Sequence, residues 1–167
     1  RRAMALTLDR QAFIDILTEG KGQRAAAMPP PPGGLWGMPP DMLAKLPGYG
    51  PDIVANRTEA RTIMKRLGYG PANRLAIKVS TRDVPAYRDP AVILLDQLKE
   101  IYFDPALEPL DTTQWYPKVM RRDHTVPLNL PATIVDDPHT LLSETDPCNG
   151  AGNYARYRNP ARPRQHP

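Results

Sequence analysis

The chain has 167 residues, of which 21 are proline and 11 are glycine, and its formal net charge is +4. This length suffices for one domain with a hydrophobic core, but not comfortably for two. There is no apolar stretch of the roughly 18 residues that a membrane span requires, and the first residues do not resemble a secretory leader. The single cysteine, Cys148, excludes an internal disulfide framework and a zinc site built from several cysteines.

The positive charge is confined to the C-terminal end. Residues 153–167 contain four arginines and no acidic residue, which leaves 18 basic and 18 acidic side chains in residues 1–152. Nucleic-acid-binding domains normally carry their charge as a patch on the fold, so the neutral body argues against a nucleic-acid partner. We expect residues 1–152 to form the domain and residues 153–167 to be a disordered basic tail.

Proline divides the chain into segments. Residues 1–28, 52–70, 72–84 and 91–104 contain no proline, and regular structure is expected there. The first segment predicts two helices that are separated near Asp9, because Asp9 can cap the second one. The second helix should end at Gly20 and Gly22. Its apolar face comprises Ala12, Phe13, Ile16 and Leu17.

Residues 28–51 contain too much proline and glycine for a helix or a sheet. We expect an ordered loop laid over the domain, because its large apolar side chains favour burial. These side chains are Leu35, Trp36, Met38, Met42 and Leu43. The alternative is a polyproline ligand for an SH3-like partner, formed by residues 29–32.

The next segments predict a helix and a strand. Asn56, with Glu59 three residues on, is close to a capping box and predicts a helix that Gly68 closes. The buried face of this helix comprises Ala60, Ile63, Met64 and Leu67. From Leu75 to Ser80 apolar and polar residues alternate, which predicts a half-buried strand.

A βαβ unit is expected to follow from this strand. Asp89 and Pro90 are typical of a helix start, and the apolar stripe behind them runs from Ala91 to Tyr102. Residues 107–110 can form the second strand of the unit. Next, Thr112 or Thr113 can cap a helix that bears Trp115 and Val119. Residues 126–130 alternate again, but their prolines limit them to an edge or irregular strand.

Residues with catalytic or metal-binding chemistry are sparse. Asp136, Asp137 and His139 could belong to a metal site or, as a distant alternative, to a small hydrolase. No second histidine or cysteine lies at ligand spacing, so we interpret them as a turn in which an aspartate binds local backbone N–H groups. Nucleophile-elbow, dinucleotide and Walker motifs are absent from the sequence. We therefore expect no enzyme, no metal and no cofactor.

Several segments, taken in chain order, carry a family resemblance. They are residues 1–10 ending in Asp9-Arg10, Pro47-Gly48-Tyr49 to Asp52, the helix Asn56–Gly68, the strand 75–80, the helix 91–101 with Gln97-Leu98-Lys99, Gln114-Trp115, Asp136-Asp137-Pro138, and Asn153-Tyr154 to Asn159-Pro160. The ordered set resembles the family 5 extracellular solute-binding proteins, the peptide- and nickel-type receptors of bacterial ABC importers. The resemblance covers nearly all of residues 1–160.

This resemblance implies an α/β fold: one lobe of a two-lobed periplasmic-binding-protein-like architecture, with a small mixed sheet flanked by helices. Family chains are about three times longer, so residues 1–152 would form a partial, C-terminal ligand-binding lobe. The implied partners are a peptide-like or other small solute, a membrane ABC permease and a second lobe of the same chain. The implied location is the periplasm. In the family the ligand lies in a cleft that closes between two lobes.

The resemblance also assigns candidate ligand-binding residues. Trp115 would pack on ligand side chains, and Arg122 at the cleft rim would meet a ligand carboxylate. The cleft-lining segment comprises Pro131, Ala132, Thr133, Ile134 and Asp136. Oligopeptide receptors keep an aspartate where this chain has Ile134, and isoleucine cannot pair with an α-amino group. A peptide with a free amine is therefore not the expected solute, and core packing is the alternative role for Trp115 and Ile134.

Two functions remain open from the sequence. The first is solute capture for uptake by an ABC importer. The alternative is an orphan or truncated interaction domain that has lost ligand binding and uses the proline-rich loop or the basic tail as its contact surface. Beyond Pro160 the sequence departs from the family pattern, and we interpret residues 161–167 as a truncated or out-of-frame end.

Overall fold

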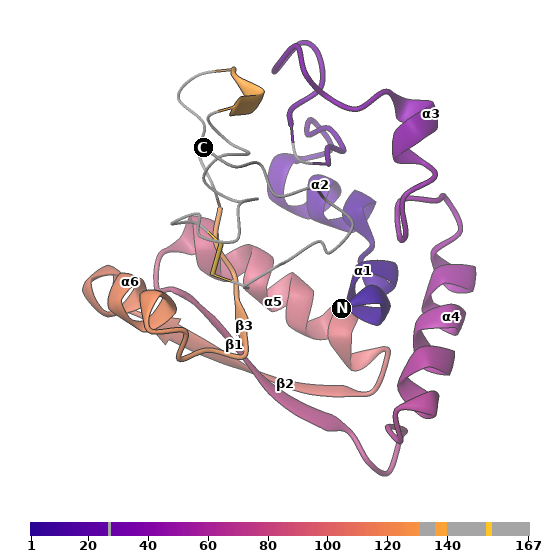
Figure 1. The fold of residues 1–167 in the computed structure, drawn as a ribbon, viewed down its shortest axis with the longest axis vertical. Coiled ribbons are helices and arrows are strands. Elements are labelled where there is room, and N and C mark those ends of the chain that lie inside the picture. Colours follow the sequence, from indigo (N-terminus) through magenta and orange to yellow (C-terminus); the bar gives the residue numbers. More distant parts are fainter. Residues whose placement is uncertain (27, 131–135, 140–152, 155–167) are drawn as a thin grey trace, which may run out of the picture.

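The computed structural model describes residues 1–26, 28–130, 136–139 and 153–154 (Figure 1). Its centre is a sheet in the order β2-β1-β3, formed by β1 (Leu75–Arg82), β2 (Phe103–Leu110) and β3 (Val126–Pro127). Both outer strands run parallel to β1. A small sheet with helices, and hence an α/β fold, is confirmed. The three described strands are all parallel, whereas a mixed sheet was expected.

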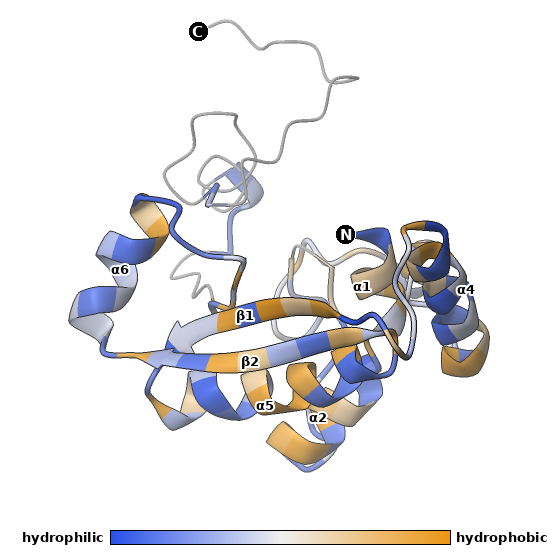
Figure 2. Cartoon of the chain, turned by 90° about the horizontal axis from the view of Figure 1, so that it is seen from below, coloured by the Kyte–Doolittle hydropathy of each residue, from blue (hydrophilic) through white to orange (hydrophobic). Residues whose placement is uncertain are grey.

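The βαβ unit is present, with different boundaries. Helix α5 (Pro85–Lys99) joins β1 to β2 and covers one face of this strand pair (Figure 2). The start expected at Asp89 is wrong, because Pro85 takes a first-turn position and Pro90 is tolerated inside the helix. Strand β2 begins at Phe103 rather than at Leu107. It accommodates two prolines because β1 is its only described neighbour.

The hydrophobic core lies between this face of the sheet and the helices. Alternate residues of both strands point into it. The buried members include Ala3, Leu6, Ala60, Met64, Ile77, Val79, Ala91, Leu98, Ile101 and Phe103. The opposite face of β1 carries Lys78 and Ser80, and α6 lies over its carboxyl end. The core therefore occupies one side of the sheet and leaves the other side for polar groups.

The N-terminal helix pair forms as expected. Helix α1 (Arg2–Thr7) is followed by α2 (Arg10–Thr18), and the carboxylate of Asp9 accepts hydrogen bonds from the first backbone N–H groups of α2. Helix α2 ends through a left-handed Glu19 followed by Gly20. Its expected apolar face is only partly covered by the described chain, since Ala12 and Phe13 are half-buried whereas Ile16 and Leu17 are exposed.

The proline-rich loop contains only the short helix α3 (Pro40–Leu43). Leu43 is buried and Met38 is half-buried, but Leu35 is 80% exposed and Trp36 is 56% exposed. The expected burial of Leu35, Trp36 and Met42 is therefore wrong. The structure fixes this part of the loop through polar contacts instead, which are described below.

Helix α4 (Ile53–Arg66) packs against α1. Its N-cap is Asp52, whose carboxylate accepts from the backbone N–H of Ala55, so the cap expected at Asn56 is wrong. Asn56 lies inside the helix. Glu59, which was expected to complete the capping box, pairs with Arg2 at 2.8 Å. Gly68 ends the segment with φ of +87°, as expected.

Helix α6 (Thr112–Met120) lies at the end of the sheet that is remote from α1 and α4 (Figures 1 and 2). Asp111 caps it, and not Thr112 or Thr113, because the Asp111 carboxylate accepts from the backbone N–H of Thr113 at 2.8 Å. The short edge strand expected near residue 126 is confirmed as β3. All helices among the described residues are too short or too polar to span a bilayer.

Candidate ligand-binding site

The carboxyl ends of the parallel strands form one edge of the sheet. β1 ends at Arg82, β2 ends at Leu110 beside it, and α6 begins directly after β2. In open parallel sheets, ligands bind outside the carboxyl ends of the strands. Two of the residues predicted to bind ligand, Trp115 and Arg122, belong to α6 or follow it, so they lie on elements at this edge.

A polar network holds α6 on the sheet. The hydroxyl of Ser80 on β1 donates to Glu108 of β2 at 2.5 Å, and the ammonium of Lys118 on α6 lies 3.5 Å from the same carboxylate. The hydrogen bond from Ser80 and the positive charge of Lys118 hold the pKa of Glu108 below its ordinary value, against the opposing effect of burial. The network thus fixes the position of α6 relative to the strand ends.

Trp115 is completely buried on the inner side of α6, together with Val119. This burial agrees with core packing of the indole ring. However, its indole N–H has no hydrogen-bond partner in the part of the chain that the structure describes. A buried donor is normally paired, so the indole N–H is an unsatisfied group within the described part of the chain. A ligand contact by Trp115 stays a prediction.

Arg122 directly follows the C-cap of α6. Its backbone has φ of 62°, in the left-handed region, and its side chain is exposed. The backbone N–H of Arg122 donates to the carbonyl of Val119, which closes the last turn of α6. The side chain is therefore exposed beyond the end of α6, and both its place at a cleft rim and its role toward a carboxylate stay predictions.

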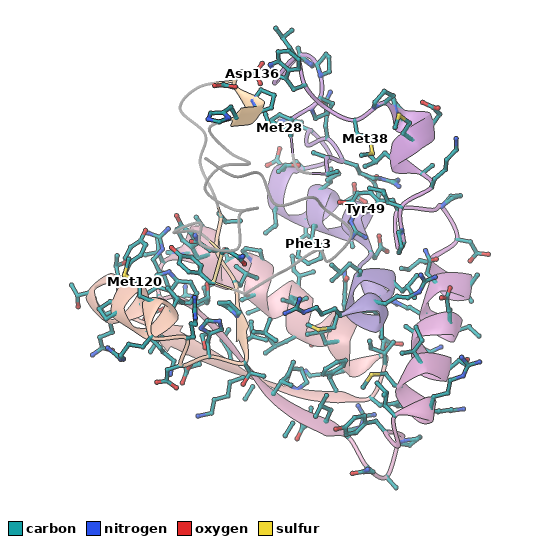
Figure 3. The ribbon with its side chains drawn as sticks, viewed as in Figure 1. Phe13, Met28, Met38, Tyr49, Met120 and Asp136 are labelled. Carbon is teal, nitrogen blue, oxygen red and sulfur yellow. The ribbon has the colours of Figure 1, made fainter. Side chains whose placement is uncertain are left out.

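Asp136 contacts the proline-rich loop (Figure 3). Its carboxylate accepts from the backbone N–H of Leu35 at 2.8 Å, and its carbonyl accepts from the indole N–H of Trp36 at 3.1 Å. These bonds link segments that are about 100 residues apart and hold the loop that carries the two exposed apolar side chains. If Asp136 also bound a ligand, its carboxylate would have to accept from the ligand as well as from the backbone N–H of Leu35.

The turn interpretation of the neighbouring residues is confirmed. The carboxylate of Asp137 accepts from the backbone N–H of His139 at 2.9 Å, which is ordinary turn chemistry. The described residues contain no group of three or more potential ligands that could hold a metal ion. The remaining predicted site residues, Pro131, Ala132, Thr133 and Ile134, lie outside the described residues, as do Cys148 and most of the tail.

Sequence reasoning missed several buried polar groups on the elements that meet at this edge. Three buried polar atoms on these elements lack a hydrogen-bond partner among the described residues: Arg82 Nε, Trp115 Nε1 and Asn129 Oδ1. Burial lowers the pKa of His124, and Lys118 acts in the same direction, while the charge of Asp123 and a hydrogen bond with the backbone of Tyr154 oppose the shift. The expected strand ended at Ser80, two residues before Arg82, so the sequence did not distinguish Arg82 from the other arginines.

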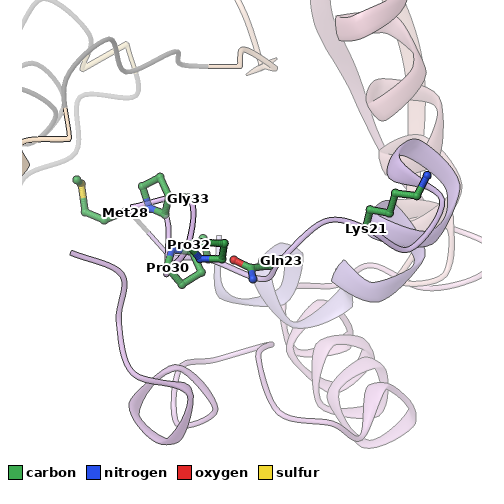
Figure 4. A pocket seen from close by; sticks show the side chains of 8 residues that line it. Lys21, Gln23, Met28, Pro30, Pro32 and Gly33 are labelled. Carbon is green, nitrogen blue, oxygen red and sulfur yellow. The ribbon is translucent and has the colours of Figure 1, made fainter. Parts of the chain in front are cut away.

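Two surface hollows lie elsewhere. One, of about 500 Å³, is lined by the proline-rich loop and by Lys21 and Gln23 (Figure 4). The other, of about 280 Å³, lies between the start of α2 and the Gly48–Ile53 segment, with Arg10 and Arg24 in its wall. Neither contains a residue that the sequence assigned to ligand binding.

The sequence profile of the bacterial extracellular solute-binding proteins, family 5 (middle region), matches residues 1–153. The chain belongs to this family. No curated protein sequence matches the chain. The resemblance seen in the order of the motifs is thus confirmed over nearly the whole chain.

Solved structures show the same fold. The murein tripeptide binding protein MppA of Escherichia coli superposes with a TM-score of 0.75 at 20% identity over 95% of this chain. The Haemophilus influenzae OppA complex with the peptide RPPGFSPFR gives the same three values. NikA of Staphylococcus aureus, in complex with Ni(L-His)2, gives a TM-score of 0.68 at 19% identity over 94% of this chain.

This family member spans about a third of the length of the structures that it matches. The covered share is 30% of MppA, 31% of OppA and 32% of NikA. The sheet and its helices therefore correspond to about a third of the architecture of these structures.

Proposed function

We propose that the chain is part of a substrate-binding protein of an ABC importer, and that it captures a peptide-like or other small solute for uptake. The observation that carries this proposal is the family match over residues 1–153, together with the same fold in proteins whose names record a murein tripeptide, a nonapeptide and a nickel–histidine complex as ligands. The role is non-covalent binding followed by delivery to a membrane permease, outside the cytoplasmic membrane and without catalysis.

The proposed contact surface is the carboxyl edge of the sheet. Trp115 on α6 and Arg122 just after it would face the solute, and Pro131, Ala132, Thr133, Ile134 and Asp136 would line the cleft. The parallel strand ends favour this edge over the two hollows. A second lobe of the same receptor would close the cleft. Because Ile134 offers no negative charge, a solute with a free amine at this position is not expected.

The reading frame upstream of Arg1 provides the first test. A continuous frame that encodes a leader and a first lobe is expected. The complete product and the 167-residue chain are then screened in parallel by thermal shift against peptides, metal chelates and other small solutes. Only the complete product should be stabilised at micromolar solute, since binding to the native state raises its stability by mass action. Submicromolar binding by the 167-residue chain alone would refute the view that it is an incomplete receptor.

The second candidate is an interaction domain that has lost ligand binding. The exposure of Leu35 and Trp36 on the proline-rich loop favours it, since large exposed apolar side chains that lie together often mark a protein contact. The two functions give opposite results in the same screen: an interaction domain would show no stabilisation by any solute in either form of the protein. A double variant, Leu35→Ser with Trp36→Ser, would then abolish binding of its protein partner.

A further inference from the structure

Among the described strands, β2 forms the longer edge of the sheet (Figure 2). It has eight residues and pairs with β1 along its whole length. The opposite edge is formed by β3, which has only two residues. A long edge strand presents unpaired backbone groups to any other extended chain and is therefore a template for self-association. The edge of β2 is such a hazard unless something prevents another strand from pairing with it.

The hydrogen bonds at the two ends of β2 show which of its residues face β1. The backbone N–H of Leu75 donates to the carbonyl of Tyr102 at 2.9 Å, and the N–H of Asp83 donates to the carbonyl of Leu110 at 2.7 Å. In a parallel pair, the N–H and C=O of one residue point to the neighbouring strand, and those of the next residue point away from it. With the observed register, the even-numbered residues of β2 face β1. The residues that face outward are Phe103, Pro105, Leu107 and Pro109.

Every second outward-facing residue of β2 is therefore a proline. Proline has no N–H to donate, so Pro105 and Pro109 each remove a hydrogen bond from any ladder that a further strand could form with β2. The carbonyl of Phe103 is already engaged, since Nη1 of Arg74 donates to it at 3.3 Å. Within the described chain, only Leu107 thus offers both an N–H and an unengaged carbonyl to an incoming strand.

Packing and strand propensity do not explain the two prolines. Valine would fill a similar volume at either position and is favoured in strands, whereas proline is depleted in them. Pro105 is buried and Pro109 is exposed, so their side chains do not share an environment. What the two residues have in common is the missing N–H at the outer edge of β2.

We propose that Pro105 and Pro109 close the outer edge of β2 to strand addition, by a second copy of this chain or by an extended segment of another protein. The inference goes beyond the proposed function, because it holds whichever solute the protein binds. It also restricts the surfaces that are open to a partner: contacts with a second lobe or another protein would involve the helices, the loops or the β3 side of the sheet, and not the edge of β2.

The first test is backbone amide hydrogen exchange of the 167-residue chain, followed by NMR. The N–H of Leu107, which faces outward, should exchange about a hundredfold or more faster than the N–H of the neighbouring Ala106, which faces β1. Its rate should not depend on protein concentration. Protection of Leu107 equal to that of Ala106 would show that the edge is already covered, and would overturn the proposal.

The second test restores the missing N–H groups. The double variant Pro105→Val with Pro109→Val should self-associate about tenfold more strongly than the wild-type chain in sedimentation velocity, because its edge carries a complete row of donors. At high protein concentration the N–H of Leu107 should then become protected from exchange. The single variant Pro109→Val changes only an exposed residue, so it leaves the core intact and should show a smaller increase of the same kind.

The matched control is Pro71→Val, at an exposed proline in the turn before β1, which should associate no more than the wild-type chain. Equal association of the double variant and the wild-type chain would overturn the proposal, and so would equal association of the double variant and Pro71→Val. Stronger association that leaves the N–H of Leu107 unprotected would show that another surface is responsible, and would also overturn it.

Discussion

The side-chain amide of Gln97 on α5 makes two hydrogen bonds with the backbone of Asp9. Its Oε1 accepts from the Asp9 N–H at 2.8 Å, and its Nε2 donates to the Asp9 carbonyl at 3.2 Å. In addition, the hydroxyl of Thr7 donates to the Gln97 carbonyl. Gln97 thereby satisfies the backbone where α1 ends and α2 begins, and it links two motifs that the sequence shows only as separate landmarks.

Replacement of Gln97 by leucine should destabilise the fold by about 2–4 kcal/mol, because two backbone groups of Asp9 would lose their partner in a largely buried position. The free energy of unfolding is measured by urea denaturation. The matched control is Gln23→Leu, at an exposed glutamine, which should change stability by less than about 0.5 kcal/mol. Equal effects of the two substitutions would contradict the role of Gln97.

Gly48 should not tolerate a side chain. Its φ is +81°, and an added Cβ would overlap the carbonyl of Ala5. The same residue receives a 2.6 Å hydrogen bond from Arg10, whose guanidinium also stacks on Tyr49 at 3.8 Å. Gly48→Ala is expected to cost about 3 kcal/mol or more, since backbone strain and overlap add.

Variants at two other glycines distinguish the cost of backbone strain from the cost of steric overlap. Gly68 has φ of +87° but open space around it, so Gly68→Ala should cost only about 1–2 kcal/mol of strain. Gly50 has neither feature, and Gly50→Ala should be close to neutral. Thermal unfolding of the three variants is expected to rank them in this order, and a Gly48 variant as stable as the Gly50 variant would refute the close approach of the loop to α1.

These contacts show which features the sequence could predict. The cap at Asp9 and the strand from Leu75 were predictable, because a helix cap and an alternating strand each depend on the types of residues that are close together in the sequence. That Asp52 rather than Asn56 caps α4 could not be predicted, since both side chains can cap a helix. The path of the preceding loop determines at which of the two residues the helix begins. The hydrogen bonds of Gln97 join residues that are 88 positions apart in the sequence, so no local sequence pattern predicts them.

The candidate site likewise contains some features that the sequence could predict and others that it could not. Helix α6 was predictable from the residues that begin and follow it, whereas burial of Trp115 was expected only under the alternative of core packing. The contacts of the Arg82 guanidinium with the rings of Tyr87 and Tyr116 were missed, because they join three different elements. The outward position of Leu35 and Trp36 was also unpredictable, because it depends on Asp136, which lies about 100 residues further on.

Asp136→Ala should loosen the proline-rich loop without unfolding the domain. The variant removes the acceptor for the Leu35 N–H, and a loss of about 0.5–1.5 kcal/mol is expected for this exposed bond. Acrylamide quenching of tryptophan fluorescence reports the change, since Trp36 is exposed and Trp115, the other tryptophan, is buried. Quenching should increase in Asp136→Ala. It should stay unchanged in Asp104→Ala, a control at an exposed aspartate of β2, and equal quenching in both variants would contradict the contact.

Glu108 should make stability depend on pH in the acid range. The hydrogen bond from Ser80, followed by the charge of Lys118, lowers the pKa of Glu108 in the folded state below its ordinary value of 4.5. The unfolded chain then binds more protons than the folded chain between the lowered pKa and 4.5, so stability falls as the pH falls through this window. The contribution is fully present above the ordinary value and is lost below the folded one.

Glu108→Gln removes this titration while keeping the side-chain size. The wild-type chain should be more stable than the variant at pH 6, and the difference should shrink as the pH is lowered below about 4.5. Urea denaturation of both proteins from pH 6 to pH 3 measures it, with Glu59→Gln as a control for a carboxylate that is paired on the surface. A wild-type advantage that persists unchanged at pH 3 would show that Glu108 stabilises α6 through packing rather than through its charge.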